Sequence, residues 1–171
     1  MSLMSQTPTA EPDIDLIKQV HRRFVTGVTV VTTLVDGEPK GLAVNAFSSI
    51  SLEPPLILVC VQQTSSTYPH LFSATHLAVN ILSAQQSDVV STFAAKKADK
   101  FAEVDWKPGP HGSPLINGSS AIMEAEICER LQASTHTIFI GRVRHAEVAD
   151  VDPMVYSAGA FYHGGNLEPL A

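Results

Sequence analysis

Apolar segments rich in β-branched residues follow one another along this chain, and most of the connections between them are short. The segments that read as strands are 27–34, 40–45, 56–61, 76–82, 120–131 and 136–148. Parallel strands need a crossover of a dozen or more residues, whereas tight turns join antiparallel ones. The Asp36-Gly37 pair is one such hairpin signal. The sequence therefore predicts a mainly β fold, a closed or nearly closed antiparallel barrel with a few short helices at its ends.

Three segments have the pattern of helices, and one has the pattern of a loop. Residues 13–24 (DIDLIKQVHRRF) place their apolar side chains on one side, so we expect an amphipathic helix that packs on the sheet. Shorter helices are expected at 67–73 and 84–95. Residues 106–118 are crowded with Pro and Gly, which is typical of a long surface loop.

Length and composition fit one folded domain. The chain has 171 residues with 44% hydrophobic and 16% charged content, which fits a single domain over residues 13–171. Residues 1–12 lack periodicity and are expected to be disordered, and Met4 suggests that the first three residues precede the native start. No apolar run approaches the roughly 18 residues that span a bilayer, and no signal peptide opens the chain. We expect a cytoplasmic protein that is not membrane-bound.

The net charge disfavours one class of partner. Nucleic-acid binding requires a basic protein surface, whereas this chain has a net charge of −6. A small anionic ligand would have to be held locally. The densest basic segment contains Lys96, Lys97 and Lys100, which form either a solvated helix face or a group from which one lysine reaches a phosphate or pyrophosphate.

Two clusters of small polar side chains lie at the ends of apolar runs. The strand at 56–61 (LILVCV) is followed by Gln62, Gln63, Thr64, Ser65, Ser66 and Thr67. Short hydroxyls beside backbone N–H groups suit a phosphate, since they donate hydrogen bonds at low entropic cost. Asn45, Ser48 and Ser49 offer a second polar edge. A planar, hydrogen-bonding ring with a phosphate tail would use both edges; the alternative is two ordinary turns.

Familiar catalytic and metal motifs are missing from the sequence. There is no GxGxxG, GxxxxGK[ST], GxSxG or HExxH pattern, which removes support for a Rossmann domain, a P-loop, an α/β hydrolase and a zinc protease. The seven histidines lack metal-ligand spacing, so no metal site is expected. Cys60 and Cys128 lie in separate strands and are interpreted as structural thiols.

One histidine and three aromatic residues are candidates for contact with a ligand. His136 follows a small polar linker and opens a strand, so it should lie at the rim of the barrel, either beside a ligand or merely capping the strand. Tyr156, Phe161 and Tyr162 could stack on an aromatic ligand, or pack in the core or against a partner subunit.

An ordered set of segments resembles a known family. The segments TGVTVVTT, GLAVNAFSSISLEPPLILVCV, HLAVNIL, DKFAEVDW, GSPLING and HTIFIGRV are similar to the flavin reductase family of two-component monooxygenases, over residues 14–163. The resemblance implies an FMN-binding split β-barrel with Greek-key topology that forms homodimers. It also implies FMN or FAD as the flavin, NADH or NADPH as the hydride donor, and an oxygenase that receives the reduced flavin.

The resemblance also implies roles for individual residues. The flavin ring would lie along Val44, Asn45, Ala46 and Phe47, with Ser48, Ser49, Cys60 and Val61 beside it. The ribityl phosphate would be held by Gln62, Ser65, Ser66 and Thr67, and the flavin tail would be bordered by Phe93 and Lys100. His136, the catalytic candidate, would stand near the flavin ring and the nicotinamide.

The chain departs from the family pattern at three places. An arginine that could pair with phosphate is absent from residues 62–66, and a carboxylate that could orient the imidazole is replaced in Ser134-Thr135-His136. The C-terminal aromatic segment is also altered, at residues 156–161.

The implied activity is direct hydride transfer from NAD(P)H to flavin, with positioning supplied by the protein. Two alternatives stay open: a flavin-binding carrier or sensor without turnover, and an oxidase of the pyridoxamine-phosphate type, which would want more basic residues.

Overall fold

The computed structural model describes residues 11–97 and 99–170, so the disorder expected at 1–12 falls almost wholly outside the described residues. The elements, in chain order, are α1 (Ile14–His21), β1 (Thr26–Gly27), β2 (Thr29–Val35), β3 (Glu38–Val44), β4 (Phe47–Leu52), β5 (Pro55–Gln62), α2 (Tyr68–Ser73), β6 (His76–Ile81), α3 (Ser87–Ala94), β7 (Trp106–Pro108), β8 (Pro114–Ile116), β9 (Ala121–Ala133), β10 (His136–Val148), β11 (Met154–Ser157), β12 (Ala160–His163) and the 3-10 turn η1 (Gly164–Asn166). The six predicted strands and three predicted helices are confirmed, within a few residues at their ends.

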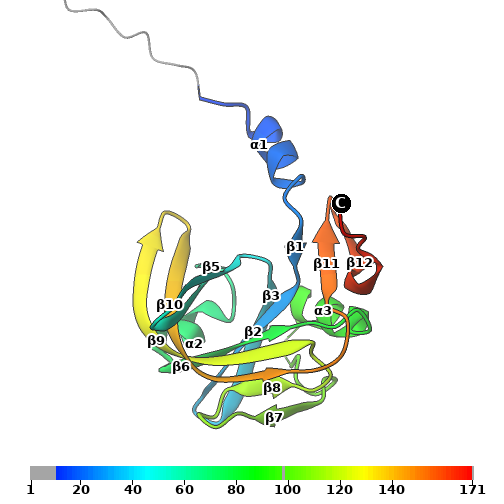
Figure 1. The fold of residues 1–171 in the computed structure, drawn as a ribbon. Helices are drawn as coiled ribbons and strands as arrows, with labels where there is room; N and C mark the ends of the chain where they lie inside the picture. Colours follow the sequence, from blue (N-terminus) through cyan, green and yellow to red (C-terminus); the bar gives the residue numbers. More distant parts are fainter. Residues whose placement is uncertain (1–10, 98, 171) are drawn as a thin grey trace, which may run out of the picture.

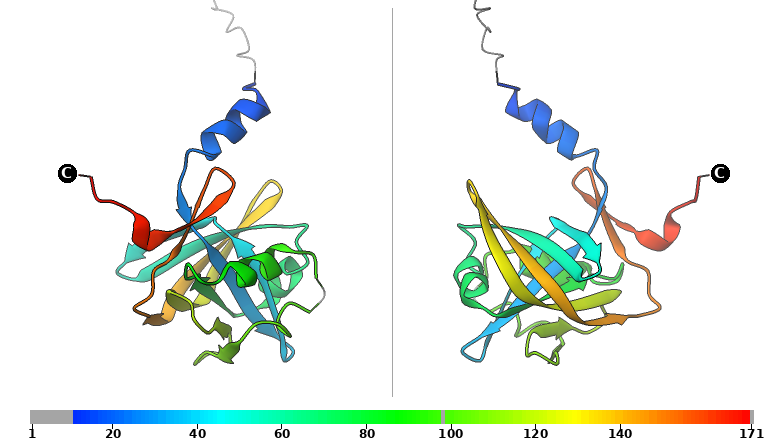
Figure 2. Two further views of the ribbon diagram at one scale, coloured as in Figure 1. Left: turned by 90° about the vertical axis from the view of Figure 1, so that its right-hand side faces the viewer. Right: turned by 60° about the vertical axis from the view of Figure 1, so that its left-hand side comes forward.

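Seven antiparallel strands form the main sheet, in the order β3-β2-β6-β9-β10-β5-β4. Figures 1 and 2 show this sheet curling into a barrel. Within the described chain, β3 and β4 each have a single strand neighbour, so the barrel is split between them. Only Asn45 and Ala46 connect these two edge strands. The predicted split antiparallel barrel is therefore confirmed, and its opening lies at a predicted site segment.

Tight turns set the register of the barrel, as the sequence predicts. Asp36 and Gly37 have φ angles of 53° and 78°, and they close the β2–β3 hairpin with Val35 opposite Glu38. Ser134, with φ 53°, turns the chain between β9 and β10. These two strands have 13 residues each and pair along their whole length, with two register shifts that bend them around the barrel.

Two large apolar clusters stabilise the fold of the described residues, beside a small one of Ala78, Leu115 and Ile122. One fills the barrel with the inward-facing residues of the strands, which include Val31, Val59, Leu77 and Phe139. The other packs α3 against the outside of the sheet and contains Val30, Phe93, Phe101, Ile116 and Met154. Residues of β2 enter both clusters in alternation, as expected for a strand that is buried on both faces.

The Pro- and Gly-rich segment at 106–118 is not the surface loop that its composition indicates. It contains the β7–β8 hairpin, in which Leu115 and Ile116 are buried. Its backbone bonds to buried side chains: Ile116 N–H donates to Asn80 Oδ1 at 2.8 Å, and Ser113 N–H donates to Glu124 Oε1 at 2.8 Å. These buried polar partners on β6 and β9 fix the segment, and a local pattern does not reveal them.

Helix α1 forms as predicted but does not pack on the sheet. Asp13 caps it by accepting from Asp15 N–H at 3.0 Å. None of its residues is buried, and Figure 1 shows it projecting from the barrel beyond β1. Ile14 is 70% exposed and Phe24, just after the helix, 74%. The prediction of packing is wrong for a single chain, because the apolar face finds no partner within the described residues.

The two cysteines differ in their exposure. Cys128 is exposed, because it lies beyond the buried part of β9, whereas Cys60 is half-buried; both are free thiols. Cys128 is therefore not the buried structural thiol that was expected. Among the helices of the described residues, none has the length and apolar character needed to cross a membrane.

Candidate flavin site

The split between β3 and β4 brings together most of the residues predicted to hold a flat ring. Ala46 carbonyl accepts from Cys60 N–H at 3.0 Å, and Phe47 lies opposite Val59 in the β4–β5 register. Asn45 and Ala46 are exposed, and Val44 and Phe47 are half-buried. A planar ligand in the split would meet half-buried apolar side chains and the backbone of two edge strands.

Strand β4 adds a polar rim to this split. Ser48 and Ser49 are exposed on it. As an edge strand, β4 presents backbone N–H and C=O groups that no second strand pairs with among the residues the structure describes. Val61 differs from its neighbours, since its side chain is fully buried in the barrel core. A ligand would reach the backbone of Val61 rather than its side chain.

His136 lies beside the polar segment that follows β5. It is the first residue of β10 and pairs with Gln62, the last residue of β5. Gln63 N–H donates to Thr135 carbonyl at 3.0 Å, and its side-chain amide donates to His136 carbonyl at 3.3 Å. The half-buried imidazole has its Nδ1 2.9 Å from Thr135 Oγ1. The barrel rim thus joins the predicted catalytic histidine to the predicted phosphate segment.

The hydroxyls of this segment differ in their freedom to bind a ligand. Thr67 is buried, and its Oγ1 donates to Gly41 carbonyl at 2.9 Å. Ser65 Oγ accepts from Thr67 N–H at 3.3 Å. Ser66 is exposed and lines a cavity. Of the three predicted hydroxyl groups, Ser66 is therefore the one most available to an anion, while Thr67 ties α2 to β3.

This cavity, of about 180 Å³, continues from the hydroxyl segment between β3, α2 and the lysine-rich segment. It is lined by Pro39, Lys40, Gly41, Ser66, Thr67, His70, Lys97, Lys100 and Phe101. We call it the basic cavity. It contains Lys100 of the predicted tail-binding pair but not Phe93, whose side chain is 1% exposed in the core. Phe93 contributes its carbonyl instead, which accepts from Lys100 Nζ at 2.8 Å.

Lys100 has an unusual setting for a lysine. Its ammonium donates to Phe93 carbonyl and, at 3.4 Å, to Gly41 carbonyl, and it lies 5.9 Å from the centre of the Phe93 ring. Burial lowers the pKa of this ammonium below its usual value of 10.5. Within residues 11–97 and 99–170, none of the ion pairs involves Lys100. A bound anion would supply the opposite charge that it lacks.

The other two lysines of the basic cavity have exposed acidic partners. Lys40 pairs with Glu38 and Lys97 with Glu103, both at 2.9 Å. The hydrogen bond from Lys40 lowers the pKa of Glu38. Such exposed pairs contribute little to stability, so a bound phosphate can replace the carboxylate as partner. The donor set of the cavity therefore fits the anionic tail of a flavin.

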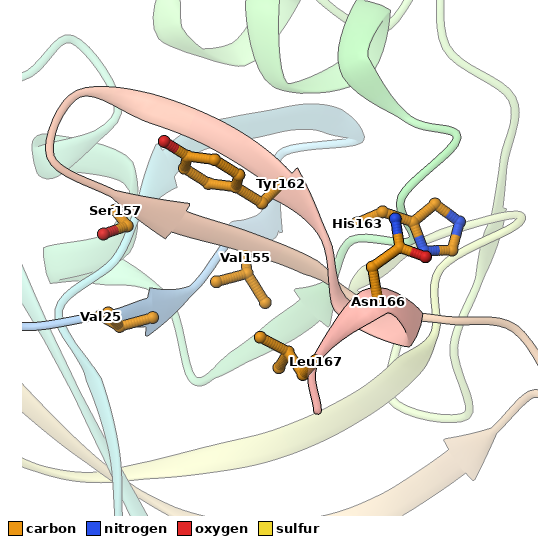
Figure 3. A pocket seen from close by; sticks show the side chains of 7 residues that line it. All are labelled: Val25, Val155, Ser157, Tyr162, His163, Asn166 and Leu167. Carbon is orange, nitrogen blue, oxygen red and sulfur yellow. The ribbon is translucent and has the colours of Figure 1, made fainter. Parts of the chain in front are cut away.

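A second and larger cavity, of about 320 Å³, lies between β1, β11, β12 and η1 and is shown in Figure 3. Its walls are Val25, Val155, Ser157, Tyr162, His163, Asn166 and Leu167, and so mostly apolar. Tyr162 is one of the three aromatic candidates named from the sequence, and none of the other six residues was predicted to contact a ligand. Tyr156 and Phe161 form an aromatic pair here, 5.6 Å between ring centres, and Phe161 and Tyr162 are about half exposed. This surface suits an apolar partner better than a phosphate.

The sequence did not point to Lys40 or His70. Each is a single basic residue in an unremarkable context, and only the barrel topology brings β3 and α2 together. The lysine-rich segment was itself a signal, and two of its lysines line the cavity. The part of the chain that the structure describes has no cluster of three or more His, Cys, Asp or Glu side chains that could hold a metal ion.

Comparison with known proteins identifies relatives of this chain. Over 147 residues it is 41% identical to a probable flavin reductase of Rhizobium meliloti, covering 85% of this chain and 47% of the relative. It is 36% identical over 164 residues to the reductase subunit of a flavin-dependent monooxygenase of Mycobacterium tuberculosis, covering 94% and 86% of the two chains. The chain thus spans about half the length of the first relative but most of the second.

A solved structure with the same fold is an NADH:FAD oxidoreductase of Streptomyces globisporus C-1027, in complex with NAD and FAD fragments. It aligns with a TM-score of 0.84 and 36% identity, over 91% of this chain and 96% of that one. Residues 21–165 match the family described as flavin reductase like domain. Because that match covers most of the barrel and its split, the chain belongs to the flavin reductase like domain family.

Proposed function

We propose that this protein is an NAD(P)H:flavin oxidoreductase that transfers hydride from NADH or NADPH to FMN or FAD and supplies reduced flavin to a partner monooxygenase. The observation that carries the proposal is the split of the barrel: the polar edge strand β4 pairs with β5, β5 ends beside His136, and the segment that follows β5 lines the basic cavity. Support also comes from the relatives, among them an enzyme named FMN reductase (NADH), which is 41% identical over 138 residues.

The residues around the split suit the two ends of a flavin. The edge of β4 and the turn at Asn45-Ala46 would hold the ring, because they offer backbone hydrogen bonds beside half-buried apolar side chains. Ser66 and Lys100 would hold the phosphate, one with a hydroxyl and the other with a positive charge. When bound, flavin supplies the hydride acceptor, and the nicotinamide supplies the hydride.

The protein's own contribution is positional. Reacting atoms about 3 to 3.5 Å apart react far faster than freely diffusing ones, so residues held rigidly beside both rings favour the reaction. Phe47 is anchored by pairing with Val59, and His136 by pairing with Gln62. The His136 imidazole would donate a hydrogen bond to the nicotinamide or its pyrophosphate, or pack on the ring, and so hold the donor in place.

A flavin that must leave for an oxygenase cannot be held too tightly. We expect a dissociation constant near micromolar, which corresponds to a binding free energy of about −8 kcal/mol. The site agrees with this, since Asn45, Ala46, Ser48 and Ser49 are all exposed. The oxygenase partner is proposed from the relatives, one of which is the reductase component of a trigonelline monooxygenase from Acinetobacter baylyi, 41% identical over 147 residues.

A homodimer is part of the proposal, and α1 is its support. An isolated helix of eight residues is unstable in water, and α1 buries no residue against its own barrel. Ile14, Ile17 and Val20 remain exposed on it, near the apolar surface of β11 and β12. Packing against a second copy would stabilise the helix and cover this surface.

A flavin carrier or sensor without turnover is a second candidate. It is favoured by one observation: the group that contacts the His136 imidazole is the Thr135 hydroxyl, where many family members have a carboxylate. A hydroxyl can orient the ring but, unlike a carboxylate, carries no negative charge.

The deciding experiment mixes the purified protein with each pairing of NADH or NADPH and FMN or FAD, and follows absorbance at the nicotinamide and flavin bands. Loss of nicotinamide absorbance in proportion to protein concentration is expected. Flavin binding without oxidation of either nucleotide would favour the carrier, and absence of flavin binding would refute both candidates.

A further inference from the structure

The basic cavity holds more cationic groups than a single phosphate needs. Lys40, Lys97 and Lys100 line it together with His70, and Ser66 adds a hydroxyl. One phosphate can be met by Ser66 and Lys100 alone, as proposed above. Lys40, Lys97 and His70 would then have no ligand of their own, although their side chains line the same space.

The cavity is also layered. Its inner part is formed by Gly41, Thr67 and Lys100, which hydrogen bonds tie together. Its outer part is formed by side chains that reach further into solvent, with Lys40 28% and Lys97 48% exposed. A ligand with two linked anionic groups would place one group in the inner part of the cavity and the other in the outer part.

The volume supports the same arrangement. A cavity of about 180 Å³ corresponds to roughly six water molecules at about 30 Å³ each. This volume is larger than the volume of a single phosphoryl group, which has one phosphorus and a few oxygen atoms. The acids near the outer part are Glu38 and Glu103, whose side chains are 68% and 61% exposed and free to turn into solvent when an anion binds.

We propose that the basic cavity binds the diphosphate of a dinucleotide flavin, with the second phosphate held by Lys40, His70 and Lys97, so that this protein prefers FAD over FMN. This inference rests on the proposed flavin site but not on turnover. The adenylate end of the ligand would leave the cavity past Lys97, on the side open to solvent.

Equilibrium titrations of the flavin-free protein with FAD, FMN and riboflavin test the preference directly. We expect FAD to bind at least about tenfold more tightly than FMN, and riboflavin to bind weakest. Equal affinity for FAD and FMN overturns the inference and leaves the reductase proposal intact. Failure to bind any of the three flavins refutes the proposed site itself.

A double variant tests the residues that carry the preference. Lys40→Gln with Lys97→Gln should weaken FAD binding by about tenfold or more, while FMN affinity stays within about twofold. Lys96→Gln is the matched control, because Lys96 is exposed in the same segment and does not line the cavity. An equal loss for both flavins, or a control that behaves like the double variant, overturns the assignment.

The nicotinamide nucleotide also carries a diphosphate, which is the alternative ligand group for the basic cavity. Titration of the FMN-saturated protein with NAD⁺ distinguishes the two sources. We expect the same affinity for NAD⁺ in the wild type and in the Lys40→Gln, Lys97→Gln variant. A loss of NAD⁺ affinity there, with FAD affinity unchanged, assigns the cavity to the hydride donor and overturns the proposal.

Discussion

Thr67→Val and Ser66→Ala should separate stability from flavin binding, although the two hydroxyls are adjacent in sequence. Thr67 is 4% exposed, and its hydroxyl donates to Gly41 carbonyl at 2.9 Å, joining α2 to β3 across 26 residues of chain. Valine keeps the shape of threonine and removes the donor. Gly41 carbonyl still accepts from Lys100 at 3.4 Å, so the substitution does not leave it without a partner.

The magnitudes follow from these contacts. A buried hydrogen bond contributes a net 0.5 to 1.5 kcal/mol, so Thr67→Val should lower the free energy of unfolding by about 1 kcal/mol. In a domain of this size that corresponds to a fall in Tm of about 2 to 4 °C. Flavin affinity should stay within a few fold. Ser66→Ala should leave Tm unchanged and weaken flavin binding by about 1.5 to 3 kcal/mol, the worth of a hydrogen bond to a charged group.

Thermal unfolding must be followed without flavin, because a bound ligand raises Tm by mass action. Flavin affinity is measured separately by titration of the folded protein. The reasoning fails if Thr67→Val leaves Tm unchanged but costs tenfold or more in flavin affinity. It fails equally if Ser66→Ala lowers Tm and leaves flavin binding intact.

Three further predictions follow from the site and from α1. His136→Ala should lower kcat/KM for NAD(P)H by about 10 to 100 fold and leave flavin affinity within a few fold; loss of flavin would make it a flavin ligand, and full activity would make it a strand cap. Burial lowers the pKa of Lys100 below 10.5, so its charge is lost as pH rises toward that value, and flavin affinity should fall over this range in the wild type but not in Lys100→Arg; parallel pH profiles would contradict this. Ile17→Asp with Val20→Asp should convert a dimer into a monomer, measured by light scattering, because both side chains are exposed on α1; a wild type that is itself monomeric would refute the homodimer.

The strands of the barrel were predictable because their signal is local. Runs such as residues 56–61 are apolar and β-branched over a length that suits a strand, and the turn at Asp36-Gly37 fixes its own backbone. Sequence reasoning missed strands β1, β4, β7, β8, β11 and β12. Five of them have two to four residues, whereas β4 has six, three of which are serines. In such segments the partner strand decides the structure, since a few residues carry no periodicity.

The residues of the candidate site also fall into two groups: those that a local sequence pattern reveals and those that only the tertiary fold brings together. The polar residues at 45–49 and the hydroxyl segment at 62–67 were visible, because each follows an apolar run, although Ser48 and Ser49 lie on strand β4. The sequence indicated only part of the basic cavity, because Lys40 and His70 reach it through the tertiary fold. Amphipathicity predicted α1 but could not say what it would pack against, because a helix face carries no information about whether its partner belongs to the same chain.

The hairpin of β9 and β10 has a consequence for motion. Both strands lie in the interior of the sheet, with β9 between β6 and β10 and β10 between β9 and β5. Opening residues 121–126 of β9 or 136–142 of β10 would break ladders on both sides, so the amide protons of these stretches should exchange with solvent most slowly, near the rate set by global unfolding. His136 is attached to the end of this slowly exchanging unit, whereas Asn45 and Ala46 join two edge strands that can open locally. The β3–β4 edge would then move to admit a ligand, while His136 keeps its position between β5 and β9.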